Sequence, residues 1–278
     1  MSMSRSQAAE LARETLAILE TGEYRTESGV TVLLKDLLLR ARKATESFPP
    51  DARLPVISPG QKRTRITVEN ASTLAGAFRL VTEGHRPLAL NFASAQNPGG
   101  GFQRGAQAQE ESLARSSGLY PWLVDNPMYE YHRSRSDATY SSYAIYSPEV
   151  PVFRDDDGKL LEQTYCCGFI TAPAVNAKVV LERDPLRLRG VQATMAGRIF
   201  KVLTIAALKH HDALVLGAWG CGVFGNDRRI IAELFRDALT GPFQGVFSRV
   251  VFAVIDPSSD QQTFGCFQGV FREHLSPP

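Results

Sequence analysis

The stretch that decides the fold is PLALNFASAQNPGGGFQRGAQAQEES, residues 87–112, which joins an apolar run to three consecutive glycines and then to two consecutive glutamates. The run PLALNFA is typical of a buried strand, and AQAQEESLARSSG favours a helix over about 108–117. A glycine loop at such a junction lets bare backbone approach a ligand. A flexible linker is the alternative, but Asn97-Pro98 and Phe102 restrict the chain on either side.

Strand-like and helix-like segments alternate outward from this stretch. Strands are predicted within 63–70, 212–220 and 248–256, and helices within 72–84, 191–211, 227–241 and 261–275. Ser72 is placed to cap one helix, and Gly84 to end it. The alternation predicts an α/β fold with a largely parallel or mixed sheet, whereas residues 118–190 are expected to be less regular.

The first sixty residues differ from the rest. They predict a helix over about 5–20, a hairpin around Ser28-Gly29, a helical or irregular segment at 36–48 and a proline-marked, linker-like passage at 49–59. We expect residues 1–60 to be a mainly helical extension packed on a core, and residues 61–278 to form one domain.

Composition narrows the partners and the compartment. The chain has 278 residues, of which 44% are hydrophobic and 22% are charged, a composition typical of a globular protein. Its net charge is only +2, so a polyanion would have to be recognised by a local site rather than by the electrostatic field of the whole protein. Cys166, Cys167, Cys221 and Cys266 show neither zinc-site nor disulfide spacing, which favours the cytoplasm. The N-terminus is expected to be a soluble helix and not a signal peptide, and no apolar run approaches the roughly 20 residues needed to span a bilayer.

A second glycine-rich junction follows the predicted strand ALVL. The segment GAWGCGVFGND, residues 217–227, places Gly220, Gly222 and Gly225 in a G-x-G-x-x-G match. A nicotinamide dinucleotide site is disfavoured, because the match comes late in the chain and no acidic residue ends a following strand at the required spacing. A tight turn without a ligand is the other alternative. Phe224, an aromatic among glycines, instead indicates packing on a sugar or base.

The two loops together indicate a ligand that carries a diphosphate. In open α/β sheets, ligands bind where strand-to-helix loops meet at the carboxyl ends of the strands. Loops rich in glycine expose backbone N–H groups to an anion, and the following helix N-termini add partial positive charge.

Glu110 and Glu111 open the helix that follows the first loop. Adjacent helical residues point about 100° apart, so we expect the two carboxylates to do different work. The alternative is that both merely stabilise the helix dipole. A general acid here requires burial or ligand charge to overcome the helix N-terminus, which lowers the pKa of a carboxyl group. Cys221 could be a nucleophile, but the sequence shows no base beside it. No serine or cysteine that would suggest a catalytic triad neighbours any of the histidines His132, His210, His211 and His274.

Gly99-Gly100-Gly101 followed after seven residues by Gln109-Glu110-Glu111 resembles the GGG-(6 to 8)-QEE signature of poly(ADP-ribose) glycohydrolases. The segment 217–227 looks like the diphosphate-binding loop of the same family. The resemblance spans about residues 60–275, and the compact length is similar to the bacterial type. It implies a macrodomain-like fold, with a mixed sheet sandwiched between helices, and an ADP-ribose-binding catalytic domain over 61–278.

The resemblance also implies roles for residues. Glu111 would protonate the leaving 2′-oxygen of the ribose–ribose bond and then activate water, while Glu110 would position the scissile ribose through its hydroxyls. Phe224 would pack on the terminal ribose, and Phe264 is the candidate for stacking adenine. Ser94 stands where the animal enzymes often have Asn. The predicted substrate-binding residues are Asn97, Gly99, Gly100, Gly101, Phe102, Gln109, Gly220, Cys221, Gly222, Val223, Phe224, Gly225, Asn226 and Phe264.

The implied activity is exo-glycohydrolase action on poly(ADP-ribose), releasing ADP-ribose without a cofactor or metal. ADP-ribosylated proteins would be its substrates, in the reversal of ADP-ribosylation during the DNA damage response of a bacterium. We expect a cytoplasmic monomer that binds neither DNA directly nor a membrane. The alternatives are a macrodomain-like ADP-ribose reader and a hydrolase of another ADP-ribose linkage, to protein or to acetyl, neither of which requires the Gln109-Glu110-Glu111 run.

Overall fold

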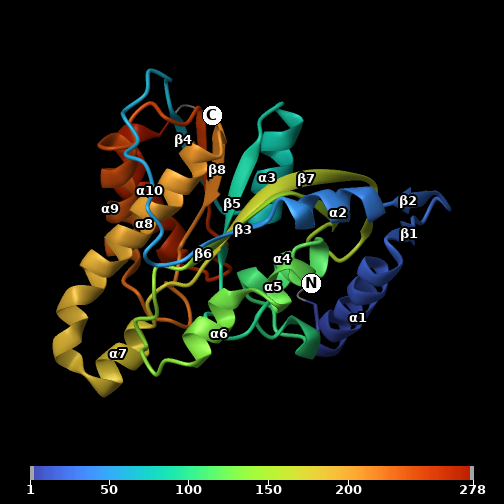
Figure 1. Cartoon of the computed structure of the whole chain (residues 1–278). Coiled ribbons are helices and arrows are strands. Elements are labelled where there is room, and N and C mark those ends of the chain that lie inside the picture. The colour runs from blue at the N-terminus through green and yellow to red at the C-terminus, as the bar shows by residue number, and fades with distance from the viewer. Residues whose placement is uncertain (1–2, 276–278) are drawn as a thin grey trace.

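The computed structural model of the protein describes residues 3–275 (Figure 1). Its strands are β1 Glu23–Arg25, β2 Thr31–Leu33, β3 Glu46–Phe48, β4 Arg65–Glu69, β5 Pro87–Phe92, β6 Ala144–Arg154, β7 Leu160–Ala172, β8 Ala213–Leu216 and β9 Arg249–Ala253. Its α-helices are α1 Arg5–Thr21, α2 Lys35–Lys43, α3 Thr73–Thr82, α4 Gln109–Ser116, α5 Tyr120–Val124, α6 Pro127–Arg133, α7 Ala177–Arg183, α8 Val191–Leu208, α9 Arg228–Thr240 and α10 Gln262–Phe271. Short 3₁₀ turns are η1 Phe102–Arg104, η2 Pro185–Gly190 and η3 Arg272–His274.

The central sheet is mixed, as the sequence predicts. Its strand order is β3-β6-β7-β5-β8-β9-β4. The pairs β7–β5, β5–β8, β8–β9 and β9–β4 are parallel, whereas β3–β6 and β6–β7 are antiparallel. The carboxyl ends of β5 and β8, which pair directly, lead into the two glycine-rich loops, so the sheet brings these loops to the same edge.

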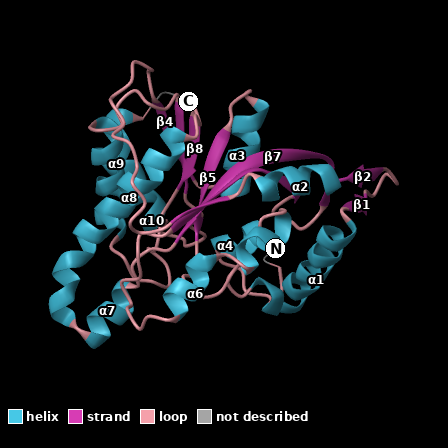
Figure 2. Ribbon diagram, viewed as in Figure 1, coloured by secondary structure: helices cyan, strands magenta, loops and turns pink. Residues whose placement is uncertain are grey.

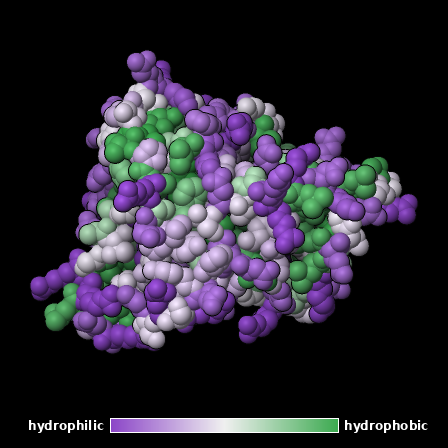
Figure 3. Space-filling model, in the orientation of Figure 1, coloured by the Kyte–Doolittle hydropathy of each residue, from purple (hydrophilic) through white to green (hydrophobic). Residues whose placement is uncertain are grey.

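Helices cover both faces of this sheet (Figures 1 and 2). One core cluster packs α8, α9 and α10 against the sheet, and a second packs α3, α4 and α6 against the opposite face. The sheet is therefore sandwiched between two helical layers, which confirms the predicted fold class. Exposed apolar side chains gather beside the β1–β2 hairpin and α2, on the right in Figure 3, where Val30, Leu33 and Leu39 are exposed.

The predicted caps are present. The Ser72 hydroxyl accepts a hydrogen bond from the Ala75 N–H at the start of α3, and Gly84 just beyond that helix has a φ of +85°. The carboxylate of Asp227 likewise accepts from the N–H groups of Arg229 and Ile230, and so fixes where α9 begins after the second loop.

The span expected to be less regular contains the longest strands. β6 and β7 pair along their length, although β6 carries Pro148 and Pro151 and a register shift between Ser147 and Val150. Glu149, inside this shift, has a φ of +50°. The bulge interrupts the alternation of buried and exposed residues, so the strand could not be recognised from its pattern.

The first sixty residues pack closely on the rest. Ala12 of α1 is buried against Phe102 and Ala114, and the Thr15 hydroxyl donates to the Arg115 carbonyl at the end of α4. β3 pairs with β6 at the edge of the central sheet. The extension therefore touches both the sheet and the helix that carries the two glutamates.

Contrary to the expectation from sequence, one helical stretch among the described residues, Pro185–Leu208, is long and apolar enough to cross a bilayer by length and composition alone. Half of this stretch is buried in the protein, and α8 contributes residues such as Met195 and Ile199 to the main core. Its apolar character is that of a core helix that packs against a sheet.

Candidate active site

The triple-glycine loop is a compact turn rather than an open linker. Gly99 and Gly100 have φ values of +66° and +61°, a region that L residues with side chains rarely adopt. The Gly100 N–H donates to the Asn97 carbonyl, and the Asn97 N–H donates to the Ser94 hydroxyl. Phe102 lies beneath the loop with its ring centroid 4.7 Å from that of Tyr120.

Each glutamate has one carboxyl oxygen fixed by the loop and one without a partner. Oε2 of Glu110 accepts from the Ser94 N–H at 2.7 Å, and Oε1 of Glu111 accepts from the Gly101 N–H at 2.9 Å. The other oxygens, Glu110 Oε1 and Glu111 Oε2, are buried and make no hydrogen bond. A buried carboxyl oxygen without a partner is costly, so the pair is prepared to exchange hydrogen bonds with a ligand.

The two carboxyl groups converge more than their helical offset predicts. A β-carbon on Gly100 would lie 2.2 Å from Glu111 Oε1 and 3.2 Å from Glu110 Oε2. Side chains in the first turn of a helix tilt back toward its N-terminus, and both reach the same loop. The two carboxyl groups therefore differ in the backbone N–H group that each accepts from, Ser94 for Glu110 and Gly101 for Glu111, and not in the overall direction in which they point.

Glu110 is the more deeply buried of the two, with 4% of its surface exposed. Burial, opposed by the hydrogen bond from Ser94 and reinforced by the neighbouring Glu111, raises the pKa of Glu110 to about 8. At pH 7 its carboxyl group is therefore mainly protonated, and its unpaired oxygen can carry a proton that it donates.

Gln109 fixes the start of α4 to the sheet. Its Oε1 accepts from the Phe92 N–H at 2.9 Å, and its Nε2 donates to the Leu90 carbonyl at 2.8 Å and to the Thr73 hydroxyl at 3.0 Å. Both ends of the amide are thus occupied by β5 and α3. In this structure Gln109 acts on the site by holding the two glutamates in place.

The second loop is closed by Asn226. Its Nδ2 donates to the Val175 carbonyl at 2.7 Å and to the Gly220 carbonyl at 3.1 Å, while its Oδ1 is buried without a partner. Gly220 and Gly225 have φ values of +75° and +68°. A β-carbon on Gly220 would lie 2.6 Å from Ala174 and from Asn226, so only glycine fits there.

The remaining predicted residues divide between surface and interior. Val223, 85% exposed, and Gly222 lie at the outside of the second loop, and the half-buried Phe224 packs against the core with its ring 6.1 Å from Tyr140. Burial raises the pKa of the Cys221 thiol to about 12, which leaves it protonated and a poor nucleophile. Phe264 is half-buried in the first turn of α10, where its N–H donates to Asp256.

Sequence reasoning did not assign Ser94 and Thr73 their parts in the site. The N–H of Ser94 fixes Glu110, and the Thr73 hydroxyl accepts from Gln109. Ser94 lies two residues beyond the end of β5, a position from which a backbone donor toward the following helix could have been anticipated. Thr73 belongs to α3, and its contact depends on the packing of two distant helices.

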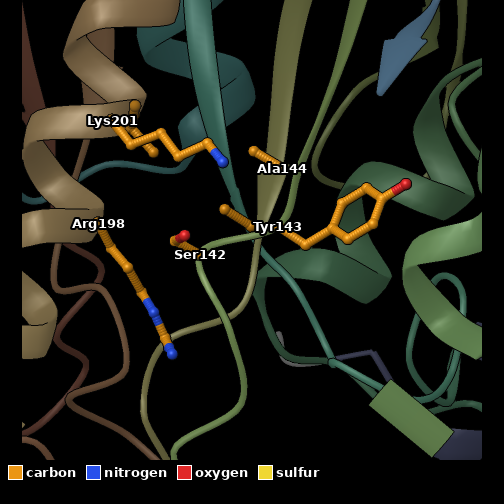
Figure 4. A pocket seen from close by; sticks show the side chains of 7 residues that line it. Ser142, Tyr143, Ala144, Arg198 and Lys201 are labelled. Carbon is orange, nitrogen blue, oxygen red and sulfur yellow. The ribbon is translucent and has the colours of Figure 1, made fainter. Parts of the chain in front are cut away.

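Two hollows lie away from the glutamates. The space between α8 and the start of β6 is lined by Arg198, Lys201 and Tyr143 among others and has no room for a water molecule (Figure 4). A groove of about 680 Å³ between α9 and α10 is lined by Arg229, Arg236 and Arg272 among others, and by none of the predicted site residues.

The family model of the microbial-type PARG catalytic domain, where PARG is poly(ADP-ribose) glycohydrolase, matches residues 12–155. This chain belongs to that family. The matched region of this microbial-type PARG contains the triple-glycine loop and both glutamates, whereas the second loop lies beyond it. No curated protein matches the chain significantly.

Solved structures extend the similarity to the second loop. The chain is 44% identical to the poly(ADP-ribose) glycohydrolase of Thermomonospora curvata, with a TM-score of 0.91, and the alignment covers 96% of this chain and 100% of that one. The same relative bound to the inhibitor ADP-HPD matches at 43% identity and a TM-score of 0.88, covering 95% of this chain and 99% of that one. The Deinococcus radiodurans enzyme in complex with ADP-ribose is 42% identical, with a TM-score of 0.80, covering 85% and 97%.

Proposed function

We propose that this microbial-type PARG is an exo-acting glycohydrolase that releases ADP-ribose from the ends of poly(ADP-ribose), with Glu111 as the catalytic acid and base. The observation that carries the proposal is the pairing of one fixed and one free oxygen on each glutamate beside Gly100. Two carboxyl groups, held by backbone and offering unpaired oxygens, suit the cleavage of a glycosidic bond.

Glu111 is arranged to transfer a proton in one direction and then the other. Since its Oε1 accepts from the Gly101 N–H, the proton for the leaving 2′-oxygen is held on Oε2. Transfer of this proton accompanies breakage of the bond between the ribose carbon and that oxygen. The resulting carboxylate takes a proton from the attacking water, whose oxygen joins the ribose carbon, and Glu111 is protonated again.

Glu110 serves as the positioning partner. Its raised pKa keeps it mainly protonated at pH 7, so it can donate a hydrogen bond to a ribose hydroxyl without placing a negative charge beside Glu111. The Ser94 N–H fixes its other oxygen and therefore its orientation. The scissile ribose would be held by Glu110 and attacked at the carbon nearest Glu111.

The two glycine-rich loops are the proposed diphosphate site. They follow the adjacent parallel strands β5 and β8, and α9 begins directly after the second loop. Backbone N–H groups and a helix N-terminus together favour an anion. Relatives crystallised with ADP-ribose and with ADP-HPD support this ligand class. Phe224 would pack on the ribose nearest the scissile bond, and Phe264 on adenine.

We also propose that the protein acts as a cytoplasmic monomer on ADP-ribosylated proteins in the DNA damage response of a bacterium. Its small net charge and the spacing of its cysteines support this setting. Size-exclusion chromatography with light scattering tests the monomer.

The decisive experiment digests purified poly(ADP-ribose) with the wild type, Glu111→Gln and the control Glu10→Gln, an exposed glutamate on α1. We expect ADP-ribose from the wild type and from the control, and at least a thousandfold slower release by Glu111→Gln. Calorimetry with ADP-ribose should give dissociation constants within about threefold for all three proteins.

The alternatives predict different results. A reader module would bind ADP-ribose but release none in the wild type, and a hydrolase of another linkage would release it only from singly modified protein or from acetylated ADP-ribose. Either result would reject the proposed reaction. Retained turnover in Glu111→Gln would instead reject the assigned residue.

A further inference from the structure

Tyr140 lies beside the second glycine-rich loop, in a backbone conformation that is unusual for an aromatic residue. Its φ is +54°, in the left-handed region that favours glycine and asparagine. No hydrogen bond from its phenol is present among the described residues, and the side chain is half-exposed. Strained residues of this kind persist where the surrounding structure holds them, and they concentrate at functional sites.

The ring of Tyr140 has two aromatic neighbours. Its centroid is 6.1 Å from Phe224 of the second loop and 5.8 Å from His132 of α6. Arg133, next to His132, donates to the carbonyl of Gln96, which precedes the triple-glycine turn. Tyr140 is thereby connected to both walls of the proposed site.

Contacts from three other parts of the chain hold the segment that carries Tyr140. Arg198 of α8 donates to the Thr139 carbonyl, and Figure 4 shows its side chain extending from α8 toward the chain before β6. The Asn176 N–H donates to the Ala138 carbonyl at 3.0 Å. Asp137 accepts from the Thr139 N–H at 2.9 Å and pairs with Arg187 of η2. The strained conformation is therefore imposed by several elements at once.

His132 also holds the segment that carries Tyr140. Its Nε2 is 2.7 Å from the Ser141 hydroxyl and accepts from the Ser141 N–H at 3.2 Å. Burial, together with the nearby Arg198 and Arg135, lowers the pKa of His132 to about 4, so the ring is neutral at pH 7 and packs as an uncharged aromatic face.

We infer that Tyr140 is a further substrate-contacting residue, which stacks on the nucleoside whose 2′-oxygen leaves. The inference rests on the proposed function. In that proposal the retained ADP-ribose extends from the glutamates, through the diphosphate between the loops, to Phe264 on α10. Tyr140 neighbours Phe224, the residue placed on the scissile ribose, and lies on the side of His132 and Arg133 instead of α10. A half-exposed aromatic ring in this position offers a face to the leaving adenosine.

The test compares the wild type with Tyr140→Asn, Tyr140→Phe and the matched control His210→Asn. Asparagine tolerates positive φ, so both asparagine variants relieve strain; His210 has a φ of +57° at the exposed end of α8, away from the site. For each protein we would measure the melting temperature, kcat and KM on poly(ADP-ribose), and the dissociation constant of ADP-ribose, which lacks the leaving nucleoside.

We expect Tyr140→Asn to raise the KM for poly(ADP-ribose) about tenfold, which is the size of the effect of one lost base–aromatic stack. The ADP-ribose affinity of this variant should stay within about twofold of the wild type, and its melting temperature within about 3 °C. Tyr140→Phe should restore KM to within threefold, and His210→Asn should change neither KM nor kcat. An unchanged polymer KM in Tyr140→Asn would overturn the inference, and so would an equal loss of ADP-ribose affinity. Failure of the wild type to digest the polymer would reject the proposed function, which is a separate result.

Discussion

Gly100 approaches Glu111 so closely that a β-carbon on the glycine would lie 2.2 Å from Oε1 and 2.9 Å from Cδ of the carboxyl group. The third glycine of the loop then donates its N–H to the same Oε1. The glycine triplet therefore has a second task besides its proposed contact with a diphosphate. It makes room for the carboxyl group of Glu111, the proposed catalytic residue, and also fixes one of its oxygens.

Gly100→Ala should consequently disable the enzyme while leaving most of the fold intact. The methyl group must displace Glu111, and alanine at a φ of +61° adds about 1–2 kcal/mol of backbone strain. We expect turnover of poly(ADP-ribose) to fall at least a hundredfold. Gly190→Ala is the control, because a β-carbon there meets no atom within 4 Å and its φ is negative. Comparable turnover of the two variants would show that the carboxyl group tolerates displacement.

Glu110 should make stability depend on pH in a direction opposite to that of an ion-paired carboxylate. Its pKa is raised from the usual 4.5 to about 8 by burial, so between these values the folded state binds more protons than the unfolded state. The contribution of Glu110 to the free energy of unfolding is therefore lost as the pH rises from about 4.5 to 8. Above that window the buried negative charge destabilises the fold.

The measurement is thermal or denaturant unfolding at pH 5, 7 and 9. The free energy of unfolding of Glu110→Gln relative to the wild type should increase by a few kcal/mol across this range, because the amide cannot ionise. Glu10→Gln, on the exposed face of α1, should follow the wild type at every pH. Parallel curves for Glu110→Gln and the wild type would mean that Glu110 ionises normally.

We expect Gln109 to affect turnover indirectly, by holding the start of α4 against the sheet. Gln109→Ala removes the partners of the Phe92 N–H and the Leu90 carbonyl, which should cost about 1–3 kcal/mol of stability. Because the start of α4 is then less firmly held, turnover should fall about tenfold or more. Gln107→Ala, two residues earlier and exposed, should have neither effect. Lost turnover with unchanged stability would instead indicate direct contact between this amide and the substrate.

Much of this site could be predicted from sequence because its signals are local. The glycine triplet, the glutamate pair and the second loop each lie within about a dozen residues, and the alternation of elements placed both loops at strand ends. Their local patterns specify backbone conformations directly. The same alternation indicated a largely parallel or mixed sheet, and the resemblance to poly(ADP-ribose) glycohydrolases implied that this sheet lies between helices.

The features that were missed depend on long-range contacts or on broken patterns. β6 was obscured by two prolines and a bulge, and β3 has only three residues at the edge of the sheet. The convergence of the glutamates on Gly100 required knowing how the loop folds back over α4. The burial of the Phe102 ring beneath the loop likewise involves Ala12, from a helix about 90 residues earlier in the chain. The contact of Phe102 with substrate stays a prediction.

Cys221 should be dispensable for chemistry despite its place in the second loop. With its pKa raised to about 12 by burial, the thiol stays protonated at neutral pH. Cys221→Ala should therefore retain turnover within about threefold, and brief treatment of the wild type with iodoacetamide at pH 7 should leave activity unchanged. Inactivation by alkylation that Cys221→Ala prevents would show a reactive thiolate at this position.

The packing of α1 beneath the first loop leads to a final prediction, that the N-terminal extension tunes the active site. Ala12 is fully buried against Phe102 and Ala114, so Ala12→Leu overpacks a site directly under the glycine turn. We expect about 1–3 kcal/mol of destabilisation and a drop in kcat larger than any change in ADP-ribose affinity, because Glu111 moves with α4. Ala17→Leu, on the exposed side of the same helix, should change neither quantity. Unfolding curves and steady-state kinetics on poly(ADP-ribose) check both variants. Destabilisation by Ala12→Leu with unaltered kcat would show that α1 supports the fold without influencing Glu111.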